Sequence, residues 1–195
     1  MGAKEQMIQI LRSGEASRIN FTFTGGSTGG MSLGRPIQIN GAALRDVATG
    51  LSNGSLRVVE NHFDENRMVY AARNDSANGF EANTFYLGNT PTYSRDFNGL
   101  VVHEAVHAYF DLQRRTIQWI DNEAAAYLAQ AAYLRNSGYP ESRIGYGTAI
   151  RIATIALADM RSSGNADMLI EALRDSLRNN PDYESYIGGT FTGDA

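Results

Sequence analysis

The stretch "LVVHEAVHAYF", residues 100–110, combines an apolar helical pattern with two of the three histidines in the chain. His103 and His107 are four residues apart, so on an α-helix they lie on one face, one turn from each other. Glu104 follows the first histidine directly and projects beside the pair. The valines and Phe110 suit the helix for burial in a hydrophobic core. This stretch therefore predicts a buried helix that can present two imidazoles to one metal ion.

A His-Glu-x-x-His sequence on a helix is typical of catalytic zinc sites. Such sites use three protein ligands and leave one coordination position open for water or substrate. A carboxylate at the position of Glu104 can take a proton from the attacking water without being a ligand itself. The chain contains no cysteine, which excludes thiolate ligands, disulfides and a cysteine nucleophile. We therefore expect a Zn²⁺ site built from His, Asp and Glu alone.

The third ligand has to come from another element. Asp111 continues the histidine face, but eight helical residues separate it from His103 by about 12 Å, whereas zinc–ligand bonds are about 2 Å long. The next segment, "DNEAAAYLAQAAYLR" (121–135), predicts a second helix with Asp121 as the N-cap and Glu123 in the first turn. Packed antiparallel to the first helix, it would direct Glu123 toward the histidines. We predict Glu123 as the third ligand, with Asp121 as the alternative.

The residues "HEAVHAYFD…NEAAAY" resemble the HExxHxxxD…NExxxD pattern of thermolysin-like gluzincins, zinc peptidases whose third ligand is a glutamate on the following helix. The resemblance covers about 25 of the 195 residues. It implies His103, His107 and Glu123 as zinc ligands and Glu104 as the general base. It also implies that Asp111 supports the second histidine from outside the ligand set.

Two features depart from the family pattern. The interval between His107 and Glu123 is 15 residues, shorter than in thermolysin by about one helical turn, which preserves the direction in which Glu123 faces. Tyr127 stands where the family has an aspartate that steadies the first histidine. The resemblance therefore implies a minimal zincin core. Such compact cores occur among stand-alone peptidases and among bacterial toxin or effector domains.

A zincin also needs a strand for its substrate and a donor for the oxyanion. Substrates of this class are laid along an edge strand, and "EANTFYLGN" (81–89) is the candidate, the alternative being an interior strand. For the oxyanion donor, the glycine-flanked segment 137–149 offers Tyr139, Arg143 and Tyr146. We favour Tyr146, because its neighbouring glycines would let it swing over a metal, although a tyrosine packed under a turn is the alternative. His62 is expected to be a structural strand residue.

The remaining patterns indicate an α+β fold, with a small mixed or antiparallel sheet in the N-terminal half and a zincin-like helical half that carries the HExxH helix. Strands are predicted at 18–26, 35–40, 55–63, 67–73 and 80–89, and further helices at 4–12, 41–51, 148–161 and 166–180. We expect a single zincin-like metallopeptidase domain over residues 1–195. Its sheet-rich part is 1–95, its helical part 96–187, and residues 188–195 form a loose tail.

Composition narrows the function classes further. Hydrophobic residues make up 43% and charged residues 19%, as in globular proteins, and the net charge of −4 argues against a nucleic-acid binder. No apolar run approaches the ~20 residues of a membrane span, and no signal peptide is visible. The expected location is therefore the cytoplasm, or export by a signal-independent route.

These observations favour zinc-dependent hydrolysis of peptide bonds, with a peptide or protein as the substrate and endopeptidase action expected. Two alternatives remain open. One is a non-catalytic, zincin-like interaction module with a structural metal; the retained Glu104 speaks against it, because a structural site has no use for that carboxylate. The other is a metal-free α+β binding domain in which the motif is accidental.

Overall fold

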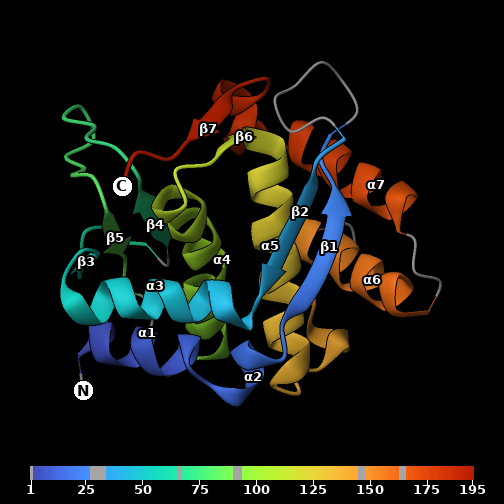
Figure 1. The fold of residues 1–195 in the computed structure, drawn as a ribbon, viewed down its shortest axis with the longest axis horizontal. Coiled ribbons are helices and arrows are strands. Elements are labelled where there is room, and N and C mark those ends of the chain that lie inside the picture. The colour runs from blue at the N-terminus through green and yellow to red at the C-terminus, as the bar shows by residue number, and fades with distance from the viewer. Residues whose placement is uncertain (1, 27–33, 66, 90–93, 145–147, 163–165) are drawn as a thin grey trace.

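The computed structural model describes all residues except 1, 27–33, 66, 90–93, 145–147 and 163–165 (Figure 1). The helices are α1 (Ala3–Leu11), α2 (Gly14–Ser17), α3 (Gly41–Asn53), α4 (Arg95–Leu112), α5 (Trp119–Asn136), α6 (Ala149–Ser162) and α7 (Asp167–Arg178), with 3-10 turns η1 (Glu141–Arg143) and η2 (Pro181–Tyr186). The strands are β1 (Asn20–Thr24), β2 (Pro36–Asn40), β3 (Arg57–Val59), β4 (Met68–Ala71), β5 (Thr84–Leu87), β6 (Thr116–Gln118) and β7 (Thr190–Thr192).

Local sequence signals account for several of these elements. In β1, Phe21 and Phe23 are buried while the residues between them are exposed, as their alternation predicts. The side chain of Asn40 caps α3 by accepting hydrogen bonds from the N–H groups of residues 42 and 43. That helix ends at Gly54, whose φ of 84° favours a residue without a side chain. Ser94 caps α4 in the same way as Asn40 caps α3.

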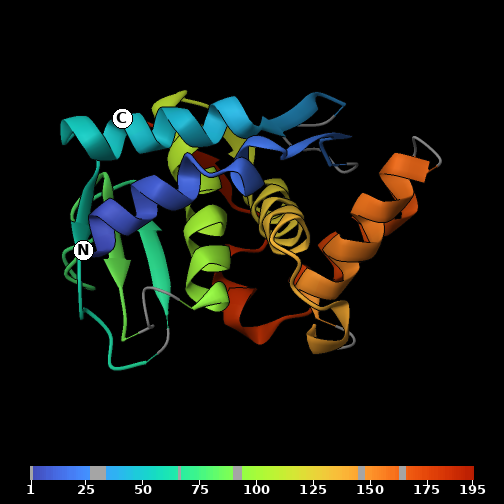
Figure 2. The same ribbon diagram turned by 90° about the horizontal axis from the view of Figure 1, so that it is seen from below.

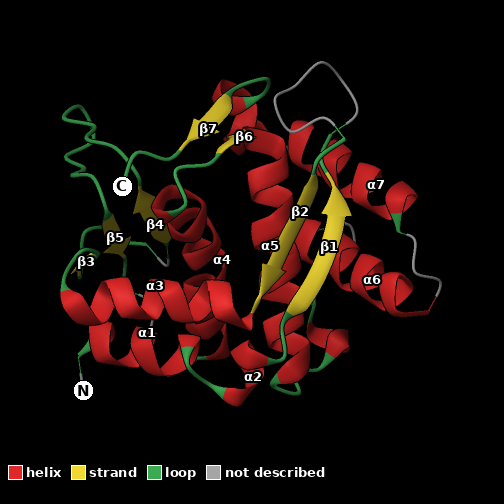
Figure 3. Ribbon diagram, viewed as in Figure 1, coloured by secondary structure: helices red, strands yellow, loops and turns green. Residues whose placement is uncertain are grey.

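The strands form three small sheets, which confirms the predicted α+β class (Figure 3). β1 and β2 are antiparallel, with Phe21 opposite Ile39. In the second sheet, of order β3-β5-β4, β5 lies between β3, to which it is parallel, and β4, to which it is antiparallel. β6 and β7 form an antiparallel pair. Helices α1 and α3 lie among the strands of the N-terminal half, as the predicted helices at 4–12 and 41–51 imply, and the short α2 is an addition to the prediction.

Helices α4 and α5 occupy the centre of the molecule. α4 packs between the β3-β5-β4 sheet and α5, and α6 followed by α7 lies on the far side of α5 (Figures 1 and 2). Both central helices are buried along most of their length. Even so, no helix in the described part of the chain is long and apolar enough to cross a membrane.

A buried ion pair fixes the start of α5. Asp121 is fully buried and accepts hydrogen bonds from Arg174 Nε and Nη2, at 2.9 and 2.6 Å, and from the N–H of Gly26, at 2.8 Å. Arg174 also donates to the carbonyl oxygen of Thr24. The prediction that Asp121 is the N-cap is wrong, because α5 begins two residues earlier, after Gln118. Asp121 instead joins α5 to α7 and to the end of β1.

The C-terminal segment is ordered rather than loose. β7 pairs with β6 in the register Ile117 opposite Phe191, so the prediction of a loose tail at 188–195 is wrong for this part. Beyond the strand, one carboxylate oxygen of Asp111 accepts hydrogen bonds from the N–H groups of Asp194 and Ala195, at 2.8 and 3.3 Å. This segment is therefore attached to the end of α4.

Candidate metal centre

Three buried side chains converge where α4 faces α5. The Nε2 atom of His103 lies 3.5 Å from Glu123 Oε2, and the Nε2 atom of His107 lies 3.4 Å from Glu123 Oε1. The possible ligand atoms of the three residues all lie within 4.8 Å of one another. The structure thus brings together the three predicted ligands in a group that could hold a metal ion.

The spacing of this group matches a divalent ion with short bonds. Ligand bonds of about 2.0–2.1 Å in a tetrahedron place neighbouring ligand atoms about 3.3–3.4 Å apart. The two nitrogen–oxygen separations are close to this value but involve different oxygens of Glu123, and all the possible ligand atoms lie within 4.8 Å of one another. Glu123 Oε2 is buried and accepts no hydrogen bond from the described residues, and such an atom is costly unless a cation or donor satisfies it. The chemistry and closeness of the donor set therefore fit a metal ion.

Two amides orient the histidines. His103 Nδ1 lies 3.2 Å from Gln130 Oε1, and His107 Nδ1 lies 2.9 Å from Asn122 Oδ1. Because each amide oxygen can accept the Nδ1–H, the Nε2 lone pair of each ring is left for the centre. His103, which comes first on α4, pairs with Gln130, which comes second on α5, and His107 pairs with Asn122. α4 and α5 are therefore antiparallel, as predicted.

The residues that the resemblance assigns to this supporting role are engaged elsewhere. Asp111 accepts a hydrogen bond of 2.5 Å from the Tyr70 hydroxyl, in addition to its bonds to residues 194 and 195. The Tyr127 ring packs edge-on against His103, with ring centres 4.7 Å apart, while its hydroxyl bonds to that of Tyr183 at 3.0 Å. The expected support of His107 by Asp111 is thus wrong, and Asn122 supplies it.

Glu104 lies beside the histidines without belonging to the ligand group. Its side chain is buried, and its Oε2 accepts a hydrogen bond of 2.8 Å from the N–H of Tyr70 on β4. Burial raises the pKa of this carboxyl above its ordinary value, although the charges of His107 and His103 act in the opposite direction. Glu104 is therefore held in place as a carboxylate with increased proton affinity.

Without a metal, the shifted pKa values of His103 and Glu123 favour a proton on the imidazole beside an ionised carboxylate. Burial lowers the pKa of His103, but the adjacent carboxylate of Glu123 outweighs burial, so the pKa is raised overall. Burial likewise raises the pKa of Glu123, but the neighbouring His107 and His103 outweigh it and lower the pKa. A divalent cation would take the place of this proton.

Metal binding should consequently weaken in acid. Because the pKa of His103 is raised, a proton competes for its Nε2 already above the ordinary imidazole pKa of about 6.5, and affinity should fall progressively as the pH is lowered through this range. Zinc titrations against a competing chelator, corrected for the protonation of the chelator itself, measure this dependence. An affinity that stays constant over this range would contradict the assigned ligand set.

The three residues lie in a cleft of about 970 Å³. β4 and its flanking residues form one wall, and aromatic side chains from α5, η2 and β7 form the other, namely Trp119, Tyr127, Tyr183, Tyr186 and Phe191. β4 is an edge strand, whereas β5, which contains most of the predicted substrate strand 81–89, is the central strand of its sheet. The prediction of an edge strand there is wrong, and β4 is the edge beside the candidate centre.

None of the residues predicted as oxyanion donors is found in the cleft among the described residues. Tyr146 lies outside the described residues, and neither Tyr139 nor Arg143 lines the cleft. Tyr183 does line it: burial raises the pKa of its hydroxyl, and the negative charges of Glu123 and Glu104 raise it further. Tyr183 therefore keeps its proton and can donate it in a hydrogen bond.

His62, the remaining histidine, packs among aromatic rings, but the prediction that it lies in a strand is wrong, because β3 ends at Val59. Its ring packs against Tyr86, Phe63 and Phe80, with ring centres 4.5, 4.8 and 5.4 Å apart. It is not among the residues that line the cleft.

Sequence reasoning missed Asn122, Gln130 and Tyr183. Gln130 could have been found, since it follows Glu123 by seven residues, two helical turns along the same face. Asn122 adjoins the ligand Glu123 and therefore starts near the centre. No comparable signal marks Tyr183, because its position depends on how η2 folds back on α5.

Replacing the supporting amides should weaken the centre without removing a ligand. Asn122→Ala or Gln130→Ala frees one imidazole to rotate, and we expect a loss of about 10–100-fold in zinc affinity. Chelator competition on each variant measures the loss, and the exposed Gln38 on β2, replaced by alanine, is the matched control. Affinities equal to that of the control would show that the amides do not orient the histidines.

Comparisons with known protein families, with curated proteins and with solved structures find no match to this chain.

Proposed function

We propose that this protein is a zinc-dependent hydrolase of peptide bonds, of the gluzincin type that its motif resembles. One observation carries the proposal. An unligated carboxylate, that of Glu104, is buried beside a His103–His107–Glu123 group that opens into a large cleft. A structural zinc site is usually closed by four protein ligands and has no use for such a carboxylate.

The roles of the side chains follow from their contacts. His103, His107 and Glu123 would hold zinc, which when bound supplies Lewis acidity that polarises a carbonyl group and acidifies water. Glu104 takes the proton of the attacking water and later delivers it to the leaving amine nitrogen. The hydrogen bond from the Tyr70 N–H occupies Oε2, so that Oε1 is the oxygen left to receive the proton.

The two walls of the cleft suggest how a peptide is held. An extended peptide can align beside the edge strand β4, where backbone groups provide affinity that does not depend on sequence. The opposite aromatic wall favours apolar or aromatic side chains in the substrate. Tyr183, which keeps its proton, is our candidate donor to the negative charge that develops on the carbonyl oxygen.

Metal analysis together with a cleavage assay tests the proposal. The purified protein should contain about one zinc ion per chain and cleave unstructured peptides, lose cleavage when treated with a chelator, and regain it when zinc is restored. Bound zinc without any cleavage of a diverse peptide library would favour a non-catalytic module. Failure to bind zinc would leave a metal-free binding domain.

A further inference from the structure

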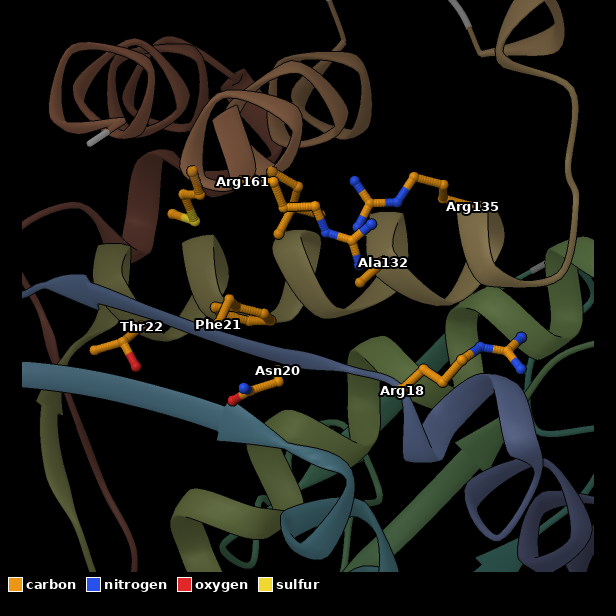
Figure 4. A pocket seen from close by; sticks show the side chains of 9 residues that line it. Arg18, Asn20, Phe21, Thr22, Ala132, Arg135 and Arg161 are labelled. Carbon is orange, nitrogen blue, oxygen red and sulfur yellow. The ribbon is translucent and has the colours of Figure 1, made fainter. Parts of the chain in front are cut away.

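A second pocket, of about 190 Å³, lies between β1, α5 and α6 (Figure 4). It shares no lining residue with the metal cleft. Ala132 in its wall follows Glu123 by nine residues, which places it on the opposite face of α5. The pocket is therefore a separate site, reached from the other side of that helix.

Three arginines line this pocket, and none of its lining residues is acidic. The side chains of Arg135 and Arg161 extend toward each other over the helix that carries Ala132 (Figure 4). Arg18 stands at the rim, where its Nη2 donates to the carbonyl oxygen of Asn136 and Glu15 is 4.0 Å away. The pocket thus gathers positive charge, and Glu15 contacts the arginine at its edge.

Neither the partly buried Arg135 nor the exposed Arg161 forms an ion pair with a carboxylate in the described part of the chain. The Nε of Arg135 is buried without a hydrogen-bond partner there. Burial and the neighbouring charge of Arg161 both lower the pKa of Arg135, while Glu141 acts weakly in the opposite direction. An arrangement of like charges with an unsatisfied buried donor is unfavourable unless an anion completes it.

The shape of the pocket limits which anion would fit. A volume of about 190 Å³ has room for roughly six water molecules. Pockets that enclose a whole nucleotide-sized ligand have larger volumes. Guanidinium groups match the oxygen spacing of a phosphate and bind it through paired hydrogen bonds. Two such groups also balance the charge of about −1.5 to −2 on a phosphate monoester at pH 7.

We propose that this pocket binds a phosphate group, held by the guanidinium groups of Arg135 and Arg161. Phe21, Leu157 and Met160 add an apolar surface against which the group bearing the phosphate can rest. The phosphate can be the free ion or the head group of a phosphomonoester, and both offer the same oxygens to the two arginines.

Calorimetric titration with inorganic phosphate at constant ionic strength tests the site. The full chain should bind phosphate saturably, and Arg135→Gln or Arg161→Gln should each weaken binding about 10–100-fold, the value of a charged hydrogen bond. Arg45→Gln, an equal change of charge at an exposed position on α3, should have no effect. The absence of saturable binding, or equal binding by all variants, would overturn the proposal.

Two further measurements establish where phosphate binds and whether the two arginines repel each other without it. Phosphate can also bind zinc, so the titration is repeated on Glu123→Ala, in which binding at the arginines should persist even if the proposed metal function fails. Thermal unfolding without phosphate should show Arg161→Gln to be no less stable than the parent, because one of two like charges is removed. A lower thermal stability of Arg161→Gln than of the parent protein would contradict the inference that Arg135 and Arg161 repel each other when no anion is bound.

Titrations with a phosphoserine peptide and with acetate distinguish the ligands. Tighter binding of the peptide than of inorganic phosphate identifies a phosphomonoester, whereas tighter binding of inorganic phosphate identifies the free ion. A preference for acetate over both would refute the phosphate assignment.

Discussion

Glu104→Gln should bind zinc as tightly as the parent protein while hydrolysing peptides about 10²–10⁴ times more slowly, the usual contribution of a general base. Glutamine has nearly the same shape, and its amide oxygen can still accept the hydrogen bond from the Tyr70 N–H. It cannot accept the proton of the attacking water. The change also replaces a buried carboxylate by a neutral group, so the fold should be retained.

Zinc content, thermal unfolding and single-turnover cleavage, measured on the same preparation, separate these effects. Cleavage at the parental rate would show that Glu104 takes no part in the reaction. Loss of zinc together with activity would instead make Glu104 a ligand and require a different coordination scheme. Glu81, an exposed glutamate before β5, gives the matched control Glu81→Gln, which should leave both zinc and rate unchanged.

Glu123→Ala should reduce zinc affinity by more than about 100-fold, because even a lost supporting residue costs about 10–100-fold. The two histidines that remain cannot hold a catalytic ion against competing buffer ligands. Glu123→Asp should retain part of the affinity, since its carboxylate is withdrawn by one methylene. Competition with a chromophoric chelator gives the affinities directly.

Asp121→Ala is the control that distinguishes the two acidic residues at the start of α5. It removes the buried carboxylate that Arg174 contacts and leaves this arginine with Glu171 as its remaining acidic partner, so we expect a loss of about 1.5–3 kcal/mol in the free energy of unfolding, with zinc still bound to the folded protein. Denaturant unfolding and metal analysis of the folded fraction measure both. If Asp121→Ala is stable but binds no zinc, while Glu123→Ala is fully loaded with zinc, then Asp121 and not Glu123 is the third ligand.

The parts of the site that follow from helical geometry were predictable. His103, His107 and Glu123 lie on facing sides of two consecutive helices, and their spacing in the sequence specifies this once antiparallel packing is assumed. Asp121 was misassigned because aspartate is a common N-cap, whereas here a buried arginine from α7 binds it. That partner is more than fifty residues away in the sequence, and no local pattern indicates it.

The arrangement of strands was harder to predict, for a related reason. Both 67–73 and 80–89 have the apolar character of strands, and only the order of the assembled sheet makes β4 the edge and β5 the centre. The segment "GGTFTGDA" contains three residues with strand character among glycines. It becomes a strand by pairing with β6, which is equally short. Such pairings depend on long-range contacts rather than on local preference.

The antiparallel pairing of α4 with α5 also affects the order in which the protein can fold. The proposed ligands and their amide partners lie between residues 103 and 130, on two helices joined by a short connection. Contacts this close in sequence form quickly, whereas the walls of the cleft need β4 from earlier in the chain and β7 from much later. A nascent chain could therefore bind a metal ion at this group before α6 and α7 have packed against α5. The ion would then act as a folding nucleus, and the cleft would be completed around a centre that is already loaded.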